Sequence, residues 1–155
     1  MNKNIEKSKR LKRLIHAEAR ECWANAWNAI KTQDEYKDAT YVEGAVIAFG
    51  DVVEHGWIEH EGEIIDPTLL DANVAYFPGL RFKGRDGLDS TWDIPGYRES
   101  GVHLPIFLRF GRGGRDSPEF LKAVVDACRS GGMDELADCC LEIARNNARQ
   151  RVNTS

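Results

Sequence analysis

The chain has 155 residues, 42% of them hydrophobic, and a formal net charge of −4 at pH 7. This length suits one domain with a buried core, and the negative charge argues against a general nucleic-acid-binding role. No apolar run is long enough for a membrane helix, and the basic start of the chain lacks the continuous apolar stretch of a signal peptide. We therefore expect a cytoplasmic protein whose four cysteines are reduced thiols.

Residues 5–32 have the pattern of helices, because they contain no Gly or Pro and their apolar residues recur at helical spacing. Within the first twenty residues, seven basic side chains stand against Glu6 and Glu18. We interpret this basic arm as a solvated amphipathic helix. The alternative is a docking surface for an acidic partner.

Three short strands are predicted next. Residues 41–49, 52–60 and 63–67 are rich in β-branched and aromatic side chains, and the dipeptides Gly50-Asp51 and Glu61-Gly62 that separate them suit two-residue turns. The pattern predicts an antiparallel meander.

The register of the second hairpin determines which polar side chains can meet. A turn at residues 61–62 places Trp57 opposite Asp66. Because side chains alternate between faces, His55 and Asp66 then share one face as diagonal neighbours, with backbone positions roughly 7–8 Å apart. His60 falls on the opposite face and is the poorer partner for Asp66.

The register of the first hairpin assigns roles to two residues of the preceding strand. A turn at residues 50–51 places Val46 opposite His55 and Gly44 opposite Trp57, where the missing side chain leaves room for the indole. Glu43 then points away from His55. We expect Glu43 to have a structural or supporting role.

Cys22, His55 and Asp66 have the chain order of a cysteine nucleophile, a histidine base and an aspartate that orients the base. A thiol is partly ionised near neutral pH, and an imidazole that takes its proton makes a thiolate–imidazolium pair. A carboxylate on the other ring nitrogen fixes the tautomer. These residue types favour amide or acyl chemistry. The structural alternative is a buried core thiol, a half-buried histidine and a turn-capping aspartate.

The same residues carry a resemblance to a known superfamily. His-x-Trp on one strand, Asp-Pro-Thr after a short hairpin and a preceding cysteine on a helix resemble the transglutaminase-like branch of the papain-like cysteine peptidases. The resemblance covers about residues 20–82. The motifs Cys-x-x-Asn-Ala, Tyr-Val-Glu-Gly, Glu-His-Gly-Trp, Ile-Asp-Pro-Thr and Tyr-Phe-Pro-Gly are also similar to small uncharacterised bacterial and phage proteins, and that second likeness names no substrate.

The resemblance implies that Cys22 is the nucleophile, His55 the general base and Asp66 the residue that orients His55. Members of this superfamily place the cysteine at a helix N-terminus, where the macrodipole and free N–H groups favour the thiolate. No helix-start signal precedes Cys22 in this sequence. Cys22 can begin a helix only if the helical pattern of residues 5–32 is interrupted before it, and we predict this break between Ala17 and Glu21.

Four further residues are candidates for supporting roles. Papain-like peptidases have an oxyanion-hole side chain, usually glutamine, about six residues before the nucleophile. By this resemblance, the matching residue here is His16, six residues before Cys22. Histidine can also donate a hydrogen bond, so His16 is a candidate oxyanion donor. The other candidate oxyanion or supporting residues are Asn25, Trp57 and Glu43.

Residues 73–114 predict irregular loops, because glycines and Pro95 punctuate them and aromatic residues lie between. Such loops either form the walls of a site or simply pack. His103 is a rival base if the hairpin register is wrong. Residues 111–115 lack the lysine and hydroxyl of a phosphate-binding loop, so we interpret them as a linker.

Two helices are predicted at the C-terminal end. Ser117-Pro118-Glu119 combines an N-cap hydroxyl, a proline at the first helical position and an acid in the first turn, and Gly131-Gly132 ends that helix. A last helix is predicted at residues 134–150. Adjacent Cys139-Cys140 without a nearby histidine does not provide zinc-ligand spacing.

These observations predict a single α+β domain over residues 1–155. The resemblance adds a papain-like or transglutaminase-like core, in which an N-terminal nucleophile helix packs on a small antiparallel sheet and C-terminal helices follow. The expected divisions are a helical arm at 1–19, a catalytic core at 20–82, loops at 83–116 and two helices at 117–150.

The expected function is a cysteine-dependent amide or acyl hydrolase or acyltransferase, such as a protease, deamidase or transglutaminase-like enzyme. Its expected substrate is a peptide or protein amide, with no metal, no cofactor and no membrane partner. The alternative is a non-catalytic binding or inhibitor module on the same fold, acting through the basic arm or the aromatic loops. The acyl acceptor and the oligomeric state stay open.

Overall fold

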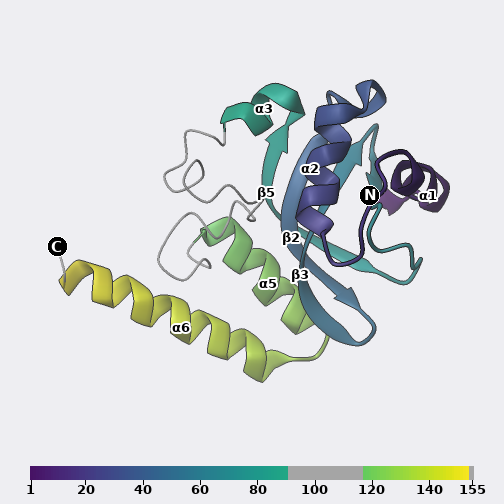
Figure 1. The fold of residues 1–155 in the computed structure, drawn as a ribbon. Coiled ribbons are helices and arrows are strands. Elements are labelled where there is room, and N and C mark those ends of the chain that lie inside the picture. Colours follow the sequence, from purple (N-terminus) through teal and green to yellow (C-terminus); the bar gives the residue numbers. More distant parts are fainter. Residues whose placement is uncertain (91–116, 154–155) are drawn as a thin grey trace.

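The computed structural model describes residues 1–90 and 117–153. Within these ranges the protein is an α+β fold, with helices packed on one face of a five-stranded sheet (Figure 1). None of the described helices is long and apolar enough to cross a membrane. The rival base His103 and the expected linker at 111–115 lie outside the described residues.

The sheet is mixed, with the strand order β1-β4-β3-β2-β5. Its strands are β1 (Asn2–Lys3), β2 (Thr40–Ala48), β3 (Asp51–His60), β4 (Glu63–Ile65) and β5 (Ala75–Lys83). Every pair of neighbours is antiparallel except β1 and β4, which are parallel. The expectation of a purely antiparallel sheet was therefore wrong, because the chain adds a strand before the first helix.

The helices are distributed along the whole described part of the chain. They are α1 (Ile5–Leu14), α2 (Cys22–Thr32), the 3₁₀ turn η1 (Asp34–Tyr36), α3 (Gly84–Ser90), α5 (Pro118–Ser130) and α6 (Asp134–Asn153). The predicted start of α5 is confirmed, since the Ser117 hydroxyl caps the helix by accepting from the N–H of Phe120 at 3.3 Å. Helix α6 packs on α5 and extends away from the sheet (Figure 1).

The N-terminal arm is only partly helical, which corrects the prediction for residues 1–19. Asn4 is the N-cap of α1, with its side chain accepting from the N–H of Lys7 at 2.9 Å, so the helix cannot begin earlier. The residues before it pair with β4 instead, and the Asn4 N–H donates to the carbonyl of Ile64 at 2.8 Å. The arm is thus docked on the sheet, where Lys7 also pairs with Glu63 at 2.8 Å.

The second hairpin has the predicted register. Glu61 and Gly62 both adopt left-handed conformations, with φ of 52° and 78°, as a type I′ turn requires. His60 lies opposite Glu63 and Ile58 opposite Ile65. Strand β4 ends at Ile65, so it covers β3 only from Ile58 to His60.

The turn of the first hairpin lies one residue earlier than predicted, which shifts the pairing of β2 with β3 by two residues. The turn lies at Phe49 and Gly50, with φ of 55° and 84°, and Gly44 rather than Val46 is opposite His55. The prediction took Gly50-Asp51 as the turn, whereas Phe49 adopts a left-handed conformation that bulky residues rarely take. Because the shift is even, each side chain stays on its predicted face.

Gly44 makes room for Trp57 even in the corrected register. A Cβ atom at this position would lie 2.9 Å from the indole Cη2 and 2.2 Å from the carbonyl oxygen of Phe77. Any side chain here would therefore displace both the indole and the neighbouring strand.

Strand β5 and helix α3 correct the expectation of irregular loops after residue 73. Pro78 and Gly79 are residue types that ordinarily interrupt a strand. In the structure, Pro78 lies opposite Gly44, where the pairing of β2 and β5 shifts by a β-bulge. A bulge tolerates the missing proline N–H.

Two hydrophobic clusters sandwich the sheet. The larger lies between the sheet and the helices and includes Leu11 of α1, Ile30 of α2, Leu88 of α3 and Phe120 of α5. The smaller lies on the opposite face and is formed by buried side chains with three partly buried neighbours: Val42, Val46, Ala48, Trp57 and Ile64, with Leu69, Val74 and Tyr76.

Candidate active site

His55 and Asp66 form a buried pair just beyond the end of β4. His55 Nε2 lies 2.8 Å from Asp66 Oδ2, and the side chains are 4% and 0% exposed. The hairpin register explains why they meet. Asp66 directly follows Ile65, the last paired residue of β4, and His55 precedes Ile58, the partner of Ile65 on β3. With Nε2 committed to Asp66, Nδ1 is the ring nitrogen left for another partner.

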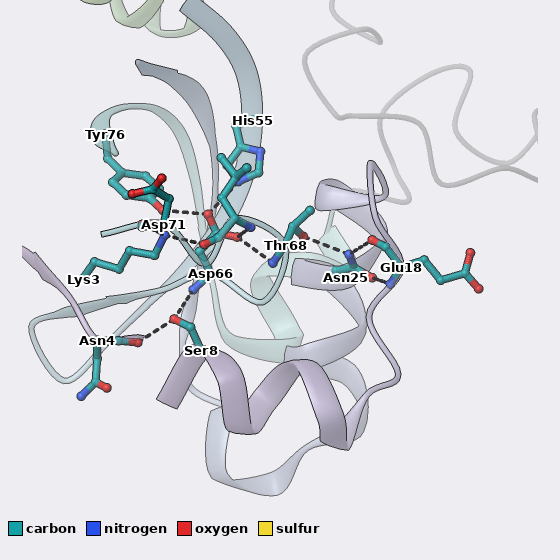
Figure 2. Close-up of polar contacts among 11 residues, drawn as sticks. Lys3, Asn4, Ser8, Glu18, Asn25, His55, Asp66, Thr68, Asp71 and Tyr76 are labelled. Atoms are coloured by element: carbon teal, nitrogen blue, oxygen red, sulfur yellow. Dashed lines mark hydrogen bonds and ion pairs between the residues drawn. The ribbon is translucent and has the colours of Figure 1, made fainter. Parts of the chain in front are cut away.

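Asp66 lies at the centre of a network of donors, as Figure 2 shows. Its Oδ1 accepts from the N–H groups of Thr68 at 2.9 Å and Leu69 at 3.0 Å. Its Oδ2 accepts from the hydroxyl of Tyr76 at 2.7 Å in addition to His55. Burial alone would raise the pKa of Asp66, but the hydrogen bonds from His55, Tyr76 and the Leu69 N–H, together with the charge of His55, outweigh burial and lower the pKa. Asp66 is therefore an ionised carboxylate.

Helix α1 holds the backbone of Asp66. The Ser8 side chain is fully buried, accepts from the Asp66 N–H at 3.0 Å and donates to the carbonyl of Asn4 at 2.6 Å. Lys3 of β1 donates to the carbonyl groups of Leu69 and Asp71. The N-terminal arm thus fixes the loop that carries the carboxylate.

The environment of His55 favours its cationic form. Burial alone would lower the pKa of this imidazole, but hydrogen bonds to Asp66 and Cys22, together with the negative charges of both groups, raise the pKa to about 9. The Cys22 thiol thus belongs to the surroundings of the ring. An imidazole with a carboxylate and a thiol as partners has the groups that an activated cysteine requires.

Cys22 is the first residue of α2, and the predicted helix break is present. Residues 15–21 are not helical, and His16 and Arg20 in this segment have left-handed φ of 52° and 69°. The N-cap residue, Glu21, makes no side-chain hydrogen bond to the first turn, and that turn contains no acidic residue. The positive end of the helix dipole is therefore left to act on the Cys22 sulfur.

Helix α2 approaches β3 closely beside these two residues. Gly56 follows His55, Trp23 follows Cys22, and a Cβ atom at Gly56 would lie 2.7 Å from Trp23 Cδ1 and 3.2 Å from Trp23 Cα. Only a glycine lets the helix backbone come this near. The contact sets the position of the thiol along the strand that carries the imidazole.

Asn25, a candidate oxyanion donor or supporting residue, has its amide engaged within the protein. Its Nδ2 donates to the carbonyl of Glu18 at 2.7 Å and to Thr68 Oγ1 at 2.9 Å, while its Oδ1 accepts from the Glu18 N–H at 3.1 Å. Both amide hydrogens are used. Asn25 therefore supports the site by tying the segment before α2 to the loop after Asp66.

Three other residues considered from the sequence are His16, Glu43 and His60. His16 is exposed in the turn after α1. Glu43 is fully buried and accepts from the Tyr41 hydroxyl at 2.6 Å. His60 packs its ring against Tyr36 at 5.3 Å between centroids, on the helix side of the sheet. The geometry brings none of these three into contact with Asp66.

Trp57 and Tyr76 contact the pair on the face of the sheet that lies opposite the helices. The Trp57 indole stacks on His55, with centroids 6.3 Å apart and planes at 18°, and meets the Tyr76 ring edge-on at 5.0 Å. Sequence analysis missed Tyr76, because residues 75–83 were expected to form a loop. Its signal was the Tyr-Phe-Pro-Gly motif, which now falls on β5.

Comparison of the chain with protein-family models, curated proteins and solved structures finds no match. Within residues 1–90 and 117–153, no three His, Cys, Asp or Glu side chains gather closely enough to hold a metal ion.

Proposed function

We propose that this chain is a cysteine-dependent amide or acyl hydrolase or acyltransferase on a transglutaminase-like core, with Cys22 as nucleophile, His55 as general acid and base, and Asp66 as the orienting residue. One observation carries the proposal: the buried bond of 2.8 Å between His55 Nε2 and Asp66 Oδ2, on an imidazole that also interacts with the thiol at the start of α2. A thiol, an imidazole and a carboxylate that orients the imidazole are the groups that thiol catalysis uses, and this supports the proposal.

The first half-reaction forms a thioester. The Cys22 thiolate attacks the carbonyl carbon of an amide, and the new C–S bond pushes the carbonyl electrons onto oxygen. His55 carries the thiol proton and donates it to the leaving nitrogen as the tetrahedral intermediate collapses. The amine departs, and the acyl group stays on Cys22.

The second half-reaction releases the acyl group. Neutral His55 takes a proton from water or from an amine as that molecule attacks the thioester carbon, and the C–S bond then breaks. The thiolate and the imidazolium are restored. Water gives hydrolysis, and an amine gives acyl transfer.

The start of α2 also suits the charge that develops on the carbonyl oxygen. The first N–H groups of a helix have no partner within that helix, and they point toward its N-terminal end. The side chain of the N-cap residue Glu21 makes no hydrogen bond to these N–H groups. Preorganised donors of this kind are worth roughly 10²–10³ in rate when they face an oxyanion.

Alkylation of the free thiols with iodoacetamide tests the proposal, because this protein contains its own control. Cys22 is buried and Cys139 is exposed. Accessibility alone would make Cys139 react first. If His55 activates Cys22, mass spectrometry at about pH 6 finds Cys22 labelled first, because only an ion-paired thiol is ionised there.

The matched variant is His55→Gln, which keeps the size and polarity of the side chain but removes the cation. Preferential labelling of Cys22 should then disappear, while labelling of Cys139 stays unchanged. If Cys139 reacts first in both proteins, the catalytic proposal fails and the non-catalytic binding module takes its place. An acyl-electrophile panel with mass analysis of the adduct then identifies the acyl group that Cys22 accepts.

A further inference from the structure

We propose that Tyr76 is a positioning residue for His55, acting through Asp66: its hydroxyl sets how much negative charge the carboxylate presents to the imidazole. This inference rests on the proposed function, because His55 matters there as the partner of the Cys22 thiolate. It adds a residue from β5 that the triad does not include.

Tyr76 and His55 share one oxygen atom. Asp66 Oδ2 accepts from the Tyr76 hydroxyl at 2.7 Å and from His55 Nε2 at 2.8 Å. The other oxygen, Oδ1, is occupied by the backbone N–H groups of Thr68 and Leu69. These two backbone bonds anchor the carboxylate without Tyr76. The hydroxyl therefore competes with the imidazole for the charge on Oδ2 rather than holding Asp66 in place.

The Tyr76 ring is held from two sides. Trp57 meets it edge-on at 5.0 Å and stacks on His55 in turn, so that four side chains close a ring of contacts: His55, Trp57, Tyr76 and Asp66. The ammonium of Lys3 lies over the Tyr76 ring, 5.4 Å from its centroid (Figure 2). The hydroxyl is thereby aimed at Oδ2.

The hydroxyl keeps its proton wherever His55 titrates. Burial, the charge of Asp66 and the hydrogen bond to Asp66 all raise the pKa of Tyr76. The charged and titratable groups that act on this cluster are Cys22 from α2, Lys3 from β1, and Asp66 and Asp71 from the loop after β4. Lys3 does not take the place of the tyrosine hydroxyl at Oδ2, because its ammonium donates to the carbonyl groups of Leu69 and Asp71 instead.

Removing the hydroxyl should therefore increase the charge that His55 feels. Tyr76→Phe keeps the contacts of the ring with Trp57 and Lys3, and takes away only the donor to Oδ2. The His55 pKa should rise above that of the unmodified protein by up to about one unit, the scale of one hydrogen bond to a charged group. Replacing Tyr76 with 3-fluorotyrosine gives a stronger donor at the same place, so the His55 pKa should fall.

The experiment is an NMR titration of the His55 imidazole nitrogens in the full chain. Tyr36→Phe is the matched control, because Tyr36 is buried but packs against His60 rather than Asp66. We expect opposite shifts for phenylalanine and 3-fluorotyrosine at position 76 and no shift for the control. A folding defect alone would not move the two titrations in opposite directions. If Tyr76→Phe does not fold, the 3-fluorotyrosine protein decides.

The outcome is separable from that of the proposed function. The same titrations are repeated with Cys22→Ala, in which no thiolate is present. If Cys22 shows no reactivity that depends on His55 but the His55 titration still responds to position 76, the proposed function fails and the role of Tyr76 on the imidazole stands. If neither change at Tyr76 moves the His55 titration, this inference is overturned whatever Cys22 does.

Discussion

Trp23 packs directly on Gly56, so the residue after the candidate nucleophile touches the residue after the candidate base. The two residues belong to α2 and β3, which otherwise meet through larger side chains. Because a backbone-to-backbone approach leaves little freedom, this contact fixes the helix start against the strand.

Gly56→Ala should therefore reduce the reactivity of Cys22 at least tenfold and lower the free energy of unfolding by about 1–3 kcal/mol, the usual cost of overpacking. Its Cβ atom would meet the Trp23 backbone, so the helix start must shift. Alkylation kinetics and urea denaturation measure the two effects. The control is Gly131→Ala, whose nearest neighbour is the flexible end of Met133, and this variant should keep normal Cys22 kinetics. Equal kinetics in the two variants would show that the contact does not position the thiol.

Asp66→Asn should preserve the fold and still reduce turnover of an acyl substrate by roughly 10³–10⁴, because an amide group no longer fixes the productive tautomer. The His55 pKa should fall at the same time, since its hydrogen bond to Asp66 and the carboxylate charge raise it. Single-turnover acylation and NMR titration test the two effects. Full turnover in this variant would mean that Asp66 is not the orienting residue.

Stability should decline as pH rises through the titration of His55. The folded pKa of about 9 lies above the ordinary value of 6.5, so the contribution of this group is fully present below about pH 6.5 and is lost as pH rises through 9. The loss should be on the order of 3 kcal/mol for a shift of this size. Denaturation of the wild type and His55→Gln across this window measures it. Parallel stability curves for the two proteins would contradict it.

Ser8→Ala should destabilise the protein by about 1–3 kcal/mol, because the buried N–H of Asp66 loses its acceptor. The loop after β4 should also loosen, and hydrogen exchange at Thr68 and Leu69 should become faster. Ser90→Ala is the control, since that residue is exposed and its hydroxyl donates to the nearby carbonyl of Gly87. An effect of Ser8→Ala no larger than that of Ser90→Ala would rule out the supporting role of α1.

The His55–Asp66 pairing could be predicted because a local rule governs it. Glu61-Gly62 selects a two-residue turn, and the turn fixes the register. The same rule did not predict the first hairpin. There Phe49, whose side chain is 80% exposed, takes a left-handed position in the turn. Its cost is offset by the nine residue pairs that β2 and β3 form in this register, and tertiary pairing of that extent is not visible in a dipeptide.

Tyr76 could not be predicted because its strand depends on a distant partner. Pro78 argues locally against a strand, and only the bulge opposite Gly44 makes the pairing possible. The same limit applies to Ser8, whose bond to Asp66 spans 58 residues. No periodic pattern marks a hydroxyl that is used once at such a separation.

The bond between Ser8 and Asp66 also sets an order of events when the chain folds. The hairpin that brings His55 toward Asp66 closes a short loop, whereas the Ser8 bond closes a loop of 58 residues and has the higher entropic cost. We expect the hairpin to form first and the N-terminal arm to dock late. Refolding experiments should therefore show that the His55–Asp66 pair forms before the Asp66 N–H bonds to Ser8 of α1. The N-terminal arm would then dock on a site whose two residues are already paired.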